Sequence, residues 1–400
     1  MENLNIWSDI GDAQILHGDC IEKMKTLKEN SIDAIITDPP YGIGFMGKKW
    51  DQSVPALAWA QECLRVLKPG GHIVAFASTR TYHRLAVNLE DAGFQIRDMI
   101  TWCYVSGFPK NLNISKQIDK AVGAERKVVG KAESWNRPNS KAGDTARMNA
   151  SPAIYNITKP ATKDAERFEG YGTALKPAQE PGCLARKPIE KGLTVAQNVL
   201  KWGTGAININ DCRFGFEDPC WIGSQSDNLN GGTYSQNASV LNRQSQVPKN
   251  GIGEYIAPSG RWPANIYQCS KPSRTEREQG LSHLSKQLAK NNVTSHNGTG
   301  DIRGIDKKPL AHVSNFHPTV KPIKLFRWLC RLLGGEKGNV ILDPFLGSGT
   351  TAVSAILEGY DIIGCERESD YLPIIRGRID WAVREYKREN AQLSLLEVMK

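Results

Sequence analysis

The sequence IITDPPYGIG at residues 35–44 is the most informative stretch of this 400-residue chain. The hydrophobic run Ile32–Ile36 is short enough for a buried strand, and the prolines at 39 and 40 cannot extend a β-ladder. Asp38-Pro39-Pro40-Tyr41 is therefore expected at the carboxyl end of a strand, where open α/β sheets place their ligand crevice. It offers a ligand a carboxylate, a carbonyl and an aromatic face. An ordinary proline-rich turn after a core strand is the alternative.

A second stretch, VILDPFLGSGTTAVSAILEGYDIIGCERESDY, occupies residues 340–371. It predicts a strand that ends at Asp343, a glycine-rich turn at 345–349 and a helix over 350–357. Glycines let the backbone approach a ligand closely, and the first turn of a helix leaves N–H groups free. The strand predicted next, over 360–365, ends at Glu366, where a carboxylate suits the two hydroxyls of a ribose.

The glycine spacing of this stretch has another reading. Residues 347–352 (GSGTTA) also satisfy the looser dinucleotide fingerprint that ends in Ala. Glycine spacing alone therefore leaves a Rossmann dehydrogenase open.

A third motif, His317-Pro318-Thr319-Val320-Lys321-Pro322, lies just before the second stretch. With Asp38-Pro39-Pro40-Tyr41 and Asp343-Pro344-Phe345-x-Gly-Ser-Gly-Thr, it resembles the motifs of DNA amino-methyltransferases, which use S-adenosylmethionine (SAM). The motif order, with the catalytic motif N-terminal, is similar to that of the permuted β group. The resemblance covers residues 15–120 and 312–380.

The resemblance implies an α/β fold of the SAM-dependent methyltransferase, Rossmann-like type. Its sheet would be doubly wound and mostly parallel with one antiparallel strand, plus an inserted target-recognition region. It also implies catalytic roles for Asp38, Pro39, Pro40 and Tyr41. The residues implied to bind SAM are Asp19, His317, Thr319, Lys321, Asp343, Pro344, Phe345, Gly347, Gly349, Thr350 and Glu366. No metal is implied.

The chemistry implied at Asp38 is methyl transfer to an exocyclic amine, whose lone pair is delocalised into the base. Asp38 and the Pro39 carbonyl can each accept one N–H of the amine, while Tyr41 stacks on a flipped base. Family members that act on adenine N6 carry Asp at the position of Asp38, and those that act on cytosine N4 more often carry Ser. Adenine in DNA is therefore expected. N4-cytosine methylation, RNA methylation and an inactive DNA-binding protein of the same fold are alternatives.

Pro219-Cys220 resembles the nucleophile motif of cytosine-C5 methyltransferases. Its context is loop-like, it follows no buried strand, and no Glu-Asn-Val tripeptide accompanies it. We therefore expect a loop thiol at Cys220.

The net charge of +9 is concentrated in the middle of the chain. Residues 121–320 contain 26 basic and 17 acidic residues, an excess equal to the net charge of the whole chain. Phosphate backbones attract such surfaces, although a merely soluble basic surface would have the same composition. The expected partner is duplex DNA with a flipped base, and a homodimer and a cognate restriction endonuclease are further candidates. The segment RWPAN at 261–265 also suggests a phage or prophage origin.

The nine cysteines contain no Cys-x-x-Cys pair, which favours reduced thiols in a cytoplasmic protein. No apolar run is long enough to span a bilayer, and the first residues lack the features of a signal peptide.

Alternating strands and helices favour a parallel sheet covered on both faces. Strands are expected at 32–36, 72–77, 94–102 and 206–214, and helices at 21–27, 56–67, 80–92, 194–202 and 324–333. Residues 180–186 resemble the family's antiparallel returning strand. The expected organisation is a catalytic half (1–120), a polar insertion (121–178), the returning strand (179–190), a target-recognition region (191–311), a SAM-binding half (312–390) and a tail (391–400).

Overall fold

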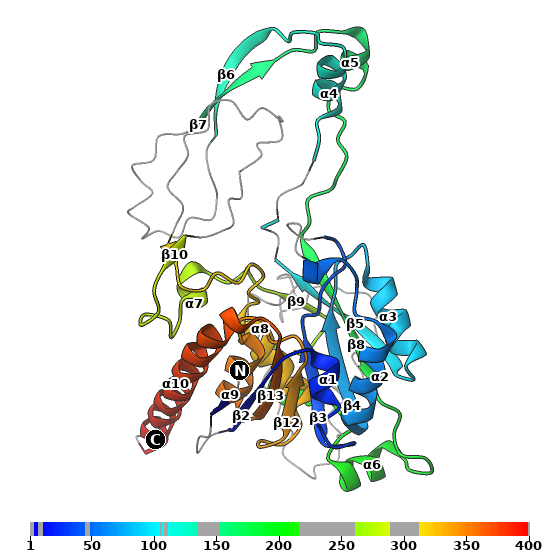
Figure 1. Ribbon diagram of the computed structural model, residues 1–400, viewed down its shortest axis with the longest axis vertical. Coiled ribbons are helices and arrows are strands. Elements are labelled where there is room, and N and C mark those ends of the chain that lie inside the picture. Colours follow the sequence, from blue (N-terminus) through cyan, green and yellow to red (C-terminus); the bar gives the residue numbers. More distant parts are fainter. Residues whose placement is uncertain are drawn as a thin grey trace, which may run out of the picture. The chain divides into compact units, whose positions relative to one another are not determined.

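The computed structural model describes residues 4–6, 11–44, 49–104, 106–107, 111–134, 153–215, 261–288 and 312–398. The chain divides into two compact units, labelled by their elements in Figure 1. Unit 1 comprises Met1–Ser106, Ala178–Lys290 and Ala311–Lys400, and unit 2 comprises Gly107–Pro177 and Asn291–Leu310. Within the described ranges, no helix is both long and apolar enough to cross a bilayer.

Unit 1 is built on a nine-stranded sheet of order β1-β2-β13-β12-β3-β4-β8-β5-β9. Its strands are β1 (Leu4–Ile6), β2 (Ala13–His17), β3 (Ile32–Thr37), β4 (Leu67–Phe76), β5 (Gln95–Cys103), β8 (Gln179–Arg186), β9 (Ile266–Gln268), β12 (Val340–Asp343) and β13 (Asp361–Glu366). A separate antiparallel pair joins β10 (Gln287–Leu288) to β11 (His312–Val313).

The sheet is mostly parallel, as expected. Strands β2, β13, β12, β3 and β4 run parallel to their neighbours in that order. Strand β8 runs antiparallel between β4 and β5, which confirms the returning strand. The short edge strand β1 is a second antiparallel strand, paired with β2, that was not expected.

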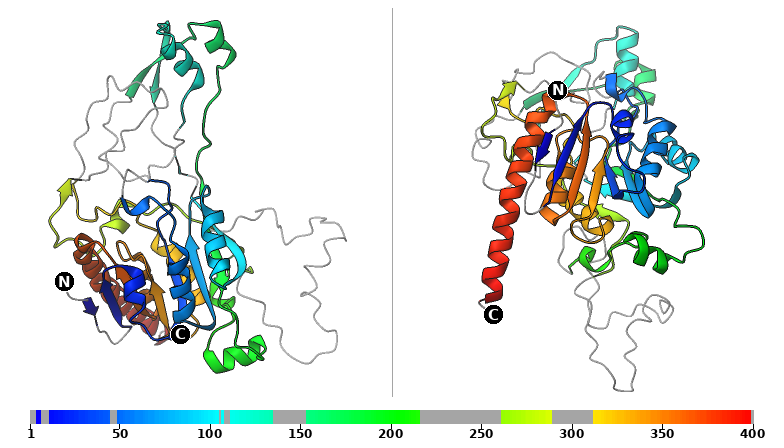
Figure 2. Two further views of the ribbon diagram at one scale, coloured as in Figure 1. Left: turned by 45° about the vertical axis from the view of Figure 1, so that its right-hand side comes forward. Right: turned by 60° about the horizontal axis from the view of Figure 1, so that its bottom comes forward.

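Helices cover both faces of the sheet (Figures 1 and 2). Alternate residues of β3 separate the faces: Ala34 and Ile36 are buried against α8, α9 and α10, and Ile35 against α1, α2 and α3. This alternation is what a doubly wound sheet requires, because successive side chains of a strand point to opposite faces. The helices of unit 1 are α1 (Cys20–Met24), α2 (Leu57–Val66), α3 (Tyr82–Asp91), α6 (Val195–Trp202), α7 (Arg274–Arg277), α8 (Ile323–Leu333), α9 (Thr350–Glu358) and α10 (Leu372–Val398), with short 3-10 turns η2 (Lys49–Asp51), η4 (Asn210–Cys212) and η6 (Ser369–Tyr371).

The two ends of the chain meet in the middle of this sheet. Strand β12 pairs with β3 through Ile341↔Ala34 and Leu342↔Ile35. The neighbours of this pair come from different ends of the sequence, so the strand order changes direction here. A topological switch point of this kind is where open α/β sheets bind ligands.

The prediction of a strand at 206–214 was wrong. That segment contains η4, and only Phe214 makes a bridge, to Arg261. Asn208 and Asp211 bond each other: the Asn208 amide donates to the Asp211 carboxylate at 2.7 Å, and the Asp211 N–H donates to Asn208 Oδ1 at 3.2 Å. Such local side-chain bonds compete with a β-ladder.

Unit 2 contains α4 (Ile114–Ala121), α5 (Lys163–Arg167) and an antiparallel pair, β6 (Val128–Ser134) with β7 (Ala153–Thr158). Its polar centre is Asp119, whose side chain is 1% exposed. The Asp119 carboxylate accepts from Arg126 Nη1 at 2.7 Å and from Thr162 Oγ1 at 2.8 Å. These bonds join α4 to the residues that begin α5, although the sequence showed only a polar insertion.

Candidate active site

Four carboxylates stand at the carboxyl ends of four adjacent parallel strands. Asp38 follows β3, Asp343 ends β12, Glu366 ends β13, and Asp19 follows β2 within two residues. All four line one pocket. The sequence placed Asp38, Asp343 and Glu366 at strand ends, and the sheet order brings all four carboxylates together.

Most of the predicted site residues share this pocket. The predicted residues that line it are Asp19, Asp38, Pro40, His317, Thr319, Lys321, Asp343, Pro344, Phe345, Gly347, Thr350 and Glu366. Pro39, Tyr41 and Gly349 lie next to these residues without lining the pocket. Trp50, Ser348, Thr351, Arg367 and Tyr371 line it as well and were not predicted to bind cofactor.

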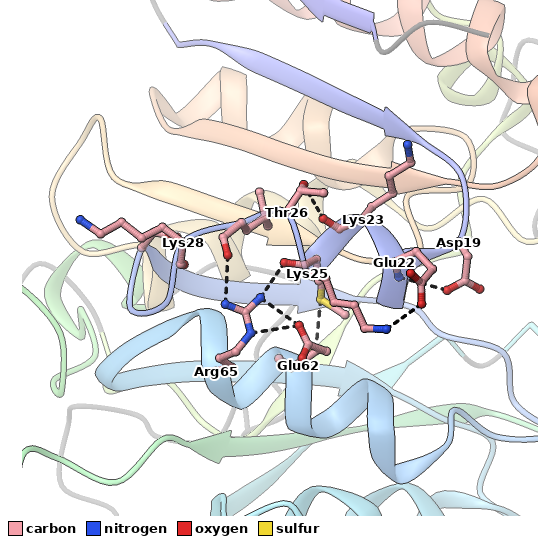
Figure 3. Close-up of polar contacts among 12 residues, drawn as sticks. Asp19, Glu22, Lys23, Lys25, Thr26, Lys28, Glu62 and Arg65 are labelled. Carbon is pink, nitrogen blue, oxygen red and sulfur yellow. Dashed lines mark hydrogen bonds and ion pairs between the residues drawn. The ribbon is translucent and has the colours of Figure 1, made fainter.

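Asp19 serves as the N-cap of α1, and its Oδ1 accepts the N–H of Ile21 at 3.0 Å. Arg65 of α2 holds the end of α1 by donating to the carbonyls of Met24 (2.7 Å) and Leu27 (3.0 Å). Figure 3 shows Arg65 bonded to this end of α1 with Glu62 beside it, and Asp19 at the start of the helix. The cap fixes the Asp19 carboxylate at the pocket rim, so capping and ligand binding are compatible.

Asp343 anchors the glycine-rich turn from inside. It is buried, and its carboxylate accepts from the hydroxyls of Thr37 (2.6 Å) and Thr351 (2.5 Å) and from the Phe345 N–H (3.0 Å). Burial raises the pKa of Asp343 to about 6 in spite of these hydrogen bonds. Because three of its roughly four acceptor positions bond the protein, Asp343 supports the turn more than it offers itself to a ligand.

His317 lies directly under Gly347, whose φ is +57°. A Cβ added at Gly347 would lie 2.8 Å from His317 Nε2, so only glycine fits both the backbone conformation and the space. Burial and the nearby cations Arg277, Lys321 and Arg378 lower the pKa of His317 to about 3. Its Nδ1 accepts the Thr319 N–H at 3.3 Å. These contacts make His317 a neutral support of the turn.

Glu366 closes the other side of the turn. Its two oxygens accept the N–H groups of Gly347 (2.8 Å) and Glu368 (2.7 Å). Burial raises the pKa of Glu366 to about 7 although both bonds favour the ionised form. A carboxylate has about four acceptor positions, so Glu366 keeps capacity for a ligand hydroxyl.

Arg378 of α10 also supports the turn, although no sequence motif marks it. Its side chain is fully buried behind the turn, where Nη1 donates to the Ser348 carbonyl at 2.8 Å and to Thr350 Oγ1 at 3.1 Å. Burial lowers its pKa to about 10. The turn is therefore backed by a cation. The signal in the sequence, one Arg in a helix of many charges, was too weak to find it.

The loop after Asp38 is held by two side chains outside the predicted motif. Asp51 Oδ1 accepts the N–H groups of Tyr41 (2.6 Å) and Gly42 (3.0 Å), and the Thr81 hydroxyl donates to the Tyr41 carbonyl at 2.7 Å. These bonds fix the position of Tyr41 relative to Asp38. The Tyr41 hydroxyl donates to Asp38 Oδ1 at 2.7 Å.

Lys321 reaches Asp38 from the motif before α8. Its Nζ lies 2.5 Å from Asp38 Oδ2 and 3.1 Å from Oε2 of Glu180, a β8 residue with no predicted role. Burial raises the pKa of Asp38. Burial also opposes the ionisation of Glu180, but the charges of Lys321 and Lys271 outweigh this effect and hold the pKa of Glu180 below its usual value. Against its burial, the two carboxylates raise the pKa of Lys321.

The Pro219-Cys220 motif falls outside the described residues. The polar stretch 222–252 lies outside them too. Within the described part of the chain, no cluster of His, Cys, Asp and Glu could hold a metal ion.

Comparison with known proteins supports one family. A family model for N6/N4 methyltransferases, described as DNA methylase, matches residues 32–377. The type II methyltransferase M.HindIII of Haemophilus influenzae is 24% identical over 91% of this chain and 94% of its own length. M.HpaI of Haemophilus parainfluenzae is 35% identical over 27% of this chain and 37% of its own length.

Two solved structures are similar over most of the chain. The M1.HpyAVI–SAM complex is 19% identical with a TM-score of 0.41, covering 92% of this chain and 98% of that one. The cytosine-N4-specific PvuII DNA methyltransferase is 15% identical with a TM-score of 0.43, covering 94% and 92%. The family match spans most of this sequence, and the chain therefore belongs to the N6/N4 DNA methylases.

Proposed function

We propose that this protein transfers a methyl group from SAM to the N6 amine of an adenine flipped out of duplex DNA. The observation that carries the proposal is the position of Asp38. Its carboxylate stands at the carboxyl end of β3 and lines the same pocket as Gly347 and Glu366. A group that accepts amine N–H bonds thus adjoins a site suited to a nucleoside cofactor.

The pocket residues fit the parts of SAM. Glu366 has acceptor capacity for ribose hydroxyls, and Asp19 stands one strand further along the edge for the adenine ring. The glycine-rich turn, with Arg378 behind it, suits the charged methionine end. SAM supplies an electrophilic sulfonium methyl when it is bound.

The task left to the chain is to aim the amine. Asp38 accepts one N–H and the Pro39 carbonyl accepts the other, which draws the nitrogen toward tetrahedral geometry. The transfer is a direct displacement without a covalent enzyme intermediate. The methylated nitrogen is acidic, so Asp38 can accept its proton without being a strong base.

Adenine is favoured over cytosine by the carboxylate at position 38, as the family pattern implies. Cytosine N4 is the second candidate, because the same pair of acceptors could hold its amine. The basic middle of the chain is proposed to contact DNA phosphates, with residues 191–311 as the target-recognition region.

The first prediction concerns the product. Incubation with labelled SAM and mixed DNA or RNA, followed by nucleoside mass spectrometry, is expected to give N6-methyladenine in duplex DNA. N4-methylcytosine without N6-methyladenine would contradict the adenine assignment, and methylated RNA alone would contradict the DNA assignment.

The second prediction concerns Asp38. Asp38→Asn keeps the shape but replaces an ionised acceptor, so single-turnover methyl transfer should fall by at least about 100-fold while the SAM dissociation constant changes by less than about threefold. Asp33→Asn is the matched control, since Asp33 is a buried carboxylate of the same strand with its own lysine, Lys68, at 2.5 Å. It should lower the melting temperature and leave the rate per folded molecule unchanged. Near-normal transfer by Asp38→Ala, which leaves no acceptor at this position, would refute the amine-holding role.

The third prediction concerns the glycine-rich turn. Gly347→Ala combines a left-handed backbone with a Cβ that meets His317, so SAM binding measured by calorimetry should weaken at least about tenfold. Gly338→Ala is the control: its φ is +84°, but its Cβ would meet nothing within 4 Å. Both variants should lose roughly 1–2 kcal/mol of stability from backbone strain. Equal SAM affinities in the two variants would show that the turn does not bind the cofactor.

A further inference from the structure

Both oxygens of the Asp38 carboxylate already have donors. Oδ1 accepts the Tyr41 hydroxyl at 2.7 Å, and Oδ2 lies 2.5 Å from the Lys321 ammonium. Under the proposed function, the target amine must bring an N–H to one of these oxygens. An ammonium is a stronger competitor for a carboxylate than a neutral amine. Each oxygen has a second acceptor position, so the amine can approach, but Asp38 holds it more strongly once these competing donors have moved away.

Lys321 cannot simply be released, because it is buried. Its side chain is 7% exposed and its Nζ lies near the faces of the Tyr41, Phe76 and Trp102 rings. A buried cation without an anionic partner is strongly unfavourable. Freeing Asp38 therefore requires a second carboxylate within reach of the same ammonium.

Glu180 meets this requirement. Its Oε2 lies 3.1 Å from Lys321 Nζ and 2.9 Å from the Tyr41 hydroxyl, so one oxygen is within reach of both donors that occupy Asp38. A tyrosine hydroxyl has one proton and can donate to only one of the two carboxylates at a time. Lys321 and Tyr41 can thus exchange Asp38 for Glu180 by small rotations.

The backbone of Glu180 is held in place while its partners exchange. Glu180 pairs with Trp102 in the ladder between β8 and β5, and Lys271 stands 3.7 Å from its other oxygen. Lys271 is half-exposed and lies over the Tyr104 ring. The second carboxylate is therefore rigidly placed and ionised.

We propose that Glu180 is a positioning residue that takes over Lys321 and the Tyr41 hydroxyl when the target amine binds, and thereby frees Asp38 to hold that amine. The inference rests on the proposed function. No covalent bond changes in this step. Lys321 and the Tyr41 hydroxyl transfer their hydrogen bonds from Asp38 to Glu180, and the Asp38 carboxylate then accepts an N–H of the amine.

The test replaces Glu180 by Gln and measures single-turnover methylation of DNA. Without the second carboxylate Lys321 stays on Asp38, so the transfer rate should fall at least about tenfold while SAM affinity stays within about twofold. Glu358→Gln is the matched control, because Glu358 is a carboxylate of similar burial that bridges Arg327 and Arg331 outside the pocket. Its rate per folded molecule should equal that of the wild type.

A pH profile separates this role from a structural one. Loss of Glu180 removes one of the two carboxylates that raise the pKa of Lys321, so the ammonium loses its proton at lower pH and releases Asp38. The Glu180→Gln rate should therefore rise between about pH 8 and about pH 10 while the wild-type rate stays flat.

The two tyrosines and the histidine that face Lys321 keep a single ionisation state in that range. Burial raises the pKa of Tyr41 well above its usual value and that of Tyr104 to about 12, and burial lowers that of His317 to about 3. Asp38, Glu180 and Lys271 complete the charged neighbours. A rise in the rate of Glu180→Gln over this range would thus report Lys321.

Glu180→Asp provides a second variant in case Glu180→Gln folds poorly. The aspartate keeps the negative charge, but its side chain is one methylene shorter and places the carboxylate farther from Lys321. We therefore expect a methylation rate between those of the wild type and Glu180→Gln, and a flatter pH profile than that of Glu180→Gln. A rate for Glu180→Gln within about twofold of wild type, or a defect in either variant that is independent of pH, would overturn the inference. Absence of methylation by the wild type would instead refute the proposed function itself.

Discussion

The site depends on the parallel pairing of β3 with β12. These strands come from opposite ends of the chain, and Thr37 at the end of β3 donates to Asp343 at the end of β12 across 306 positions of sequence. The pairing places the motif at Asp38–Tyr41 and the glycine-rich turn at one edge of the sheet. Without it, neither half of the chain would have a complete pocket.

The carboxylates at that edge differ in how their oxygens are used. Asp343 and Glu366 bond hydroxyls and backbone N–H groups that the fold keeps in place. Asp38 bonds two side-chain donors that have another acceptor in Glu180. Fixed partners suit a residue that shapes the turn, and exchangeable partners suit a residue that must receive a substrate. The same chemical group, a carboxylate, thus has different roles according to the residues that surround it.

Much of this edge could be predicted from the sequence, because strand-terminal motifs report local structure. Asp38, Asp343 and Glu366 were each expected at a strand end, and a parallel sheet gathers strand ends on one side. Lys321 was expected to bind SAM, and the structure adds its contact with Asp38. That contact spans 283 positions and has no local signature.

Other parts of the site could not be predicted, because long-range contacts leave no local signature in the sequence. Glu180 and Arg378 act through contacts with residues far away in sequence, and their own neighbours carry no motif. The error at 206–214 had a different origin: its apolar pattern resembled a strand, but Asn208 and Asp211 bond each other instead of a neighbouring chain. Polar side chains in a short apolar segment outweighed the pattern.

The most direct test of the account is a crystal structure of the protein with duplex DNA and a non-reactive SAM analogue. The account predicts an extrahelical adenine whose amine lies within hydrogen-bond distance of Asp38 and the Pro39 carbonyl, with Lys321 Nζ moved onto Glu180. The amine would face the position of the transferable methyl above the turn at Gly347. A base bound elsewhere, or an amine held while Lys321 still contacts Asp38 alone, would contradict it.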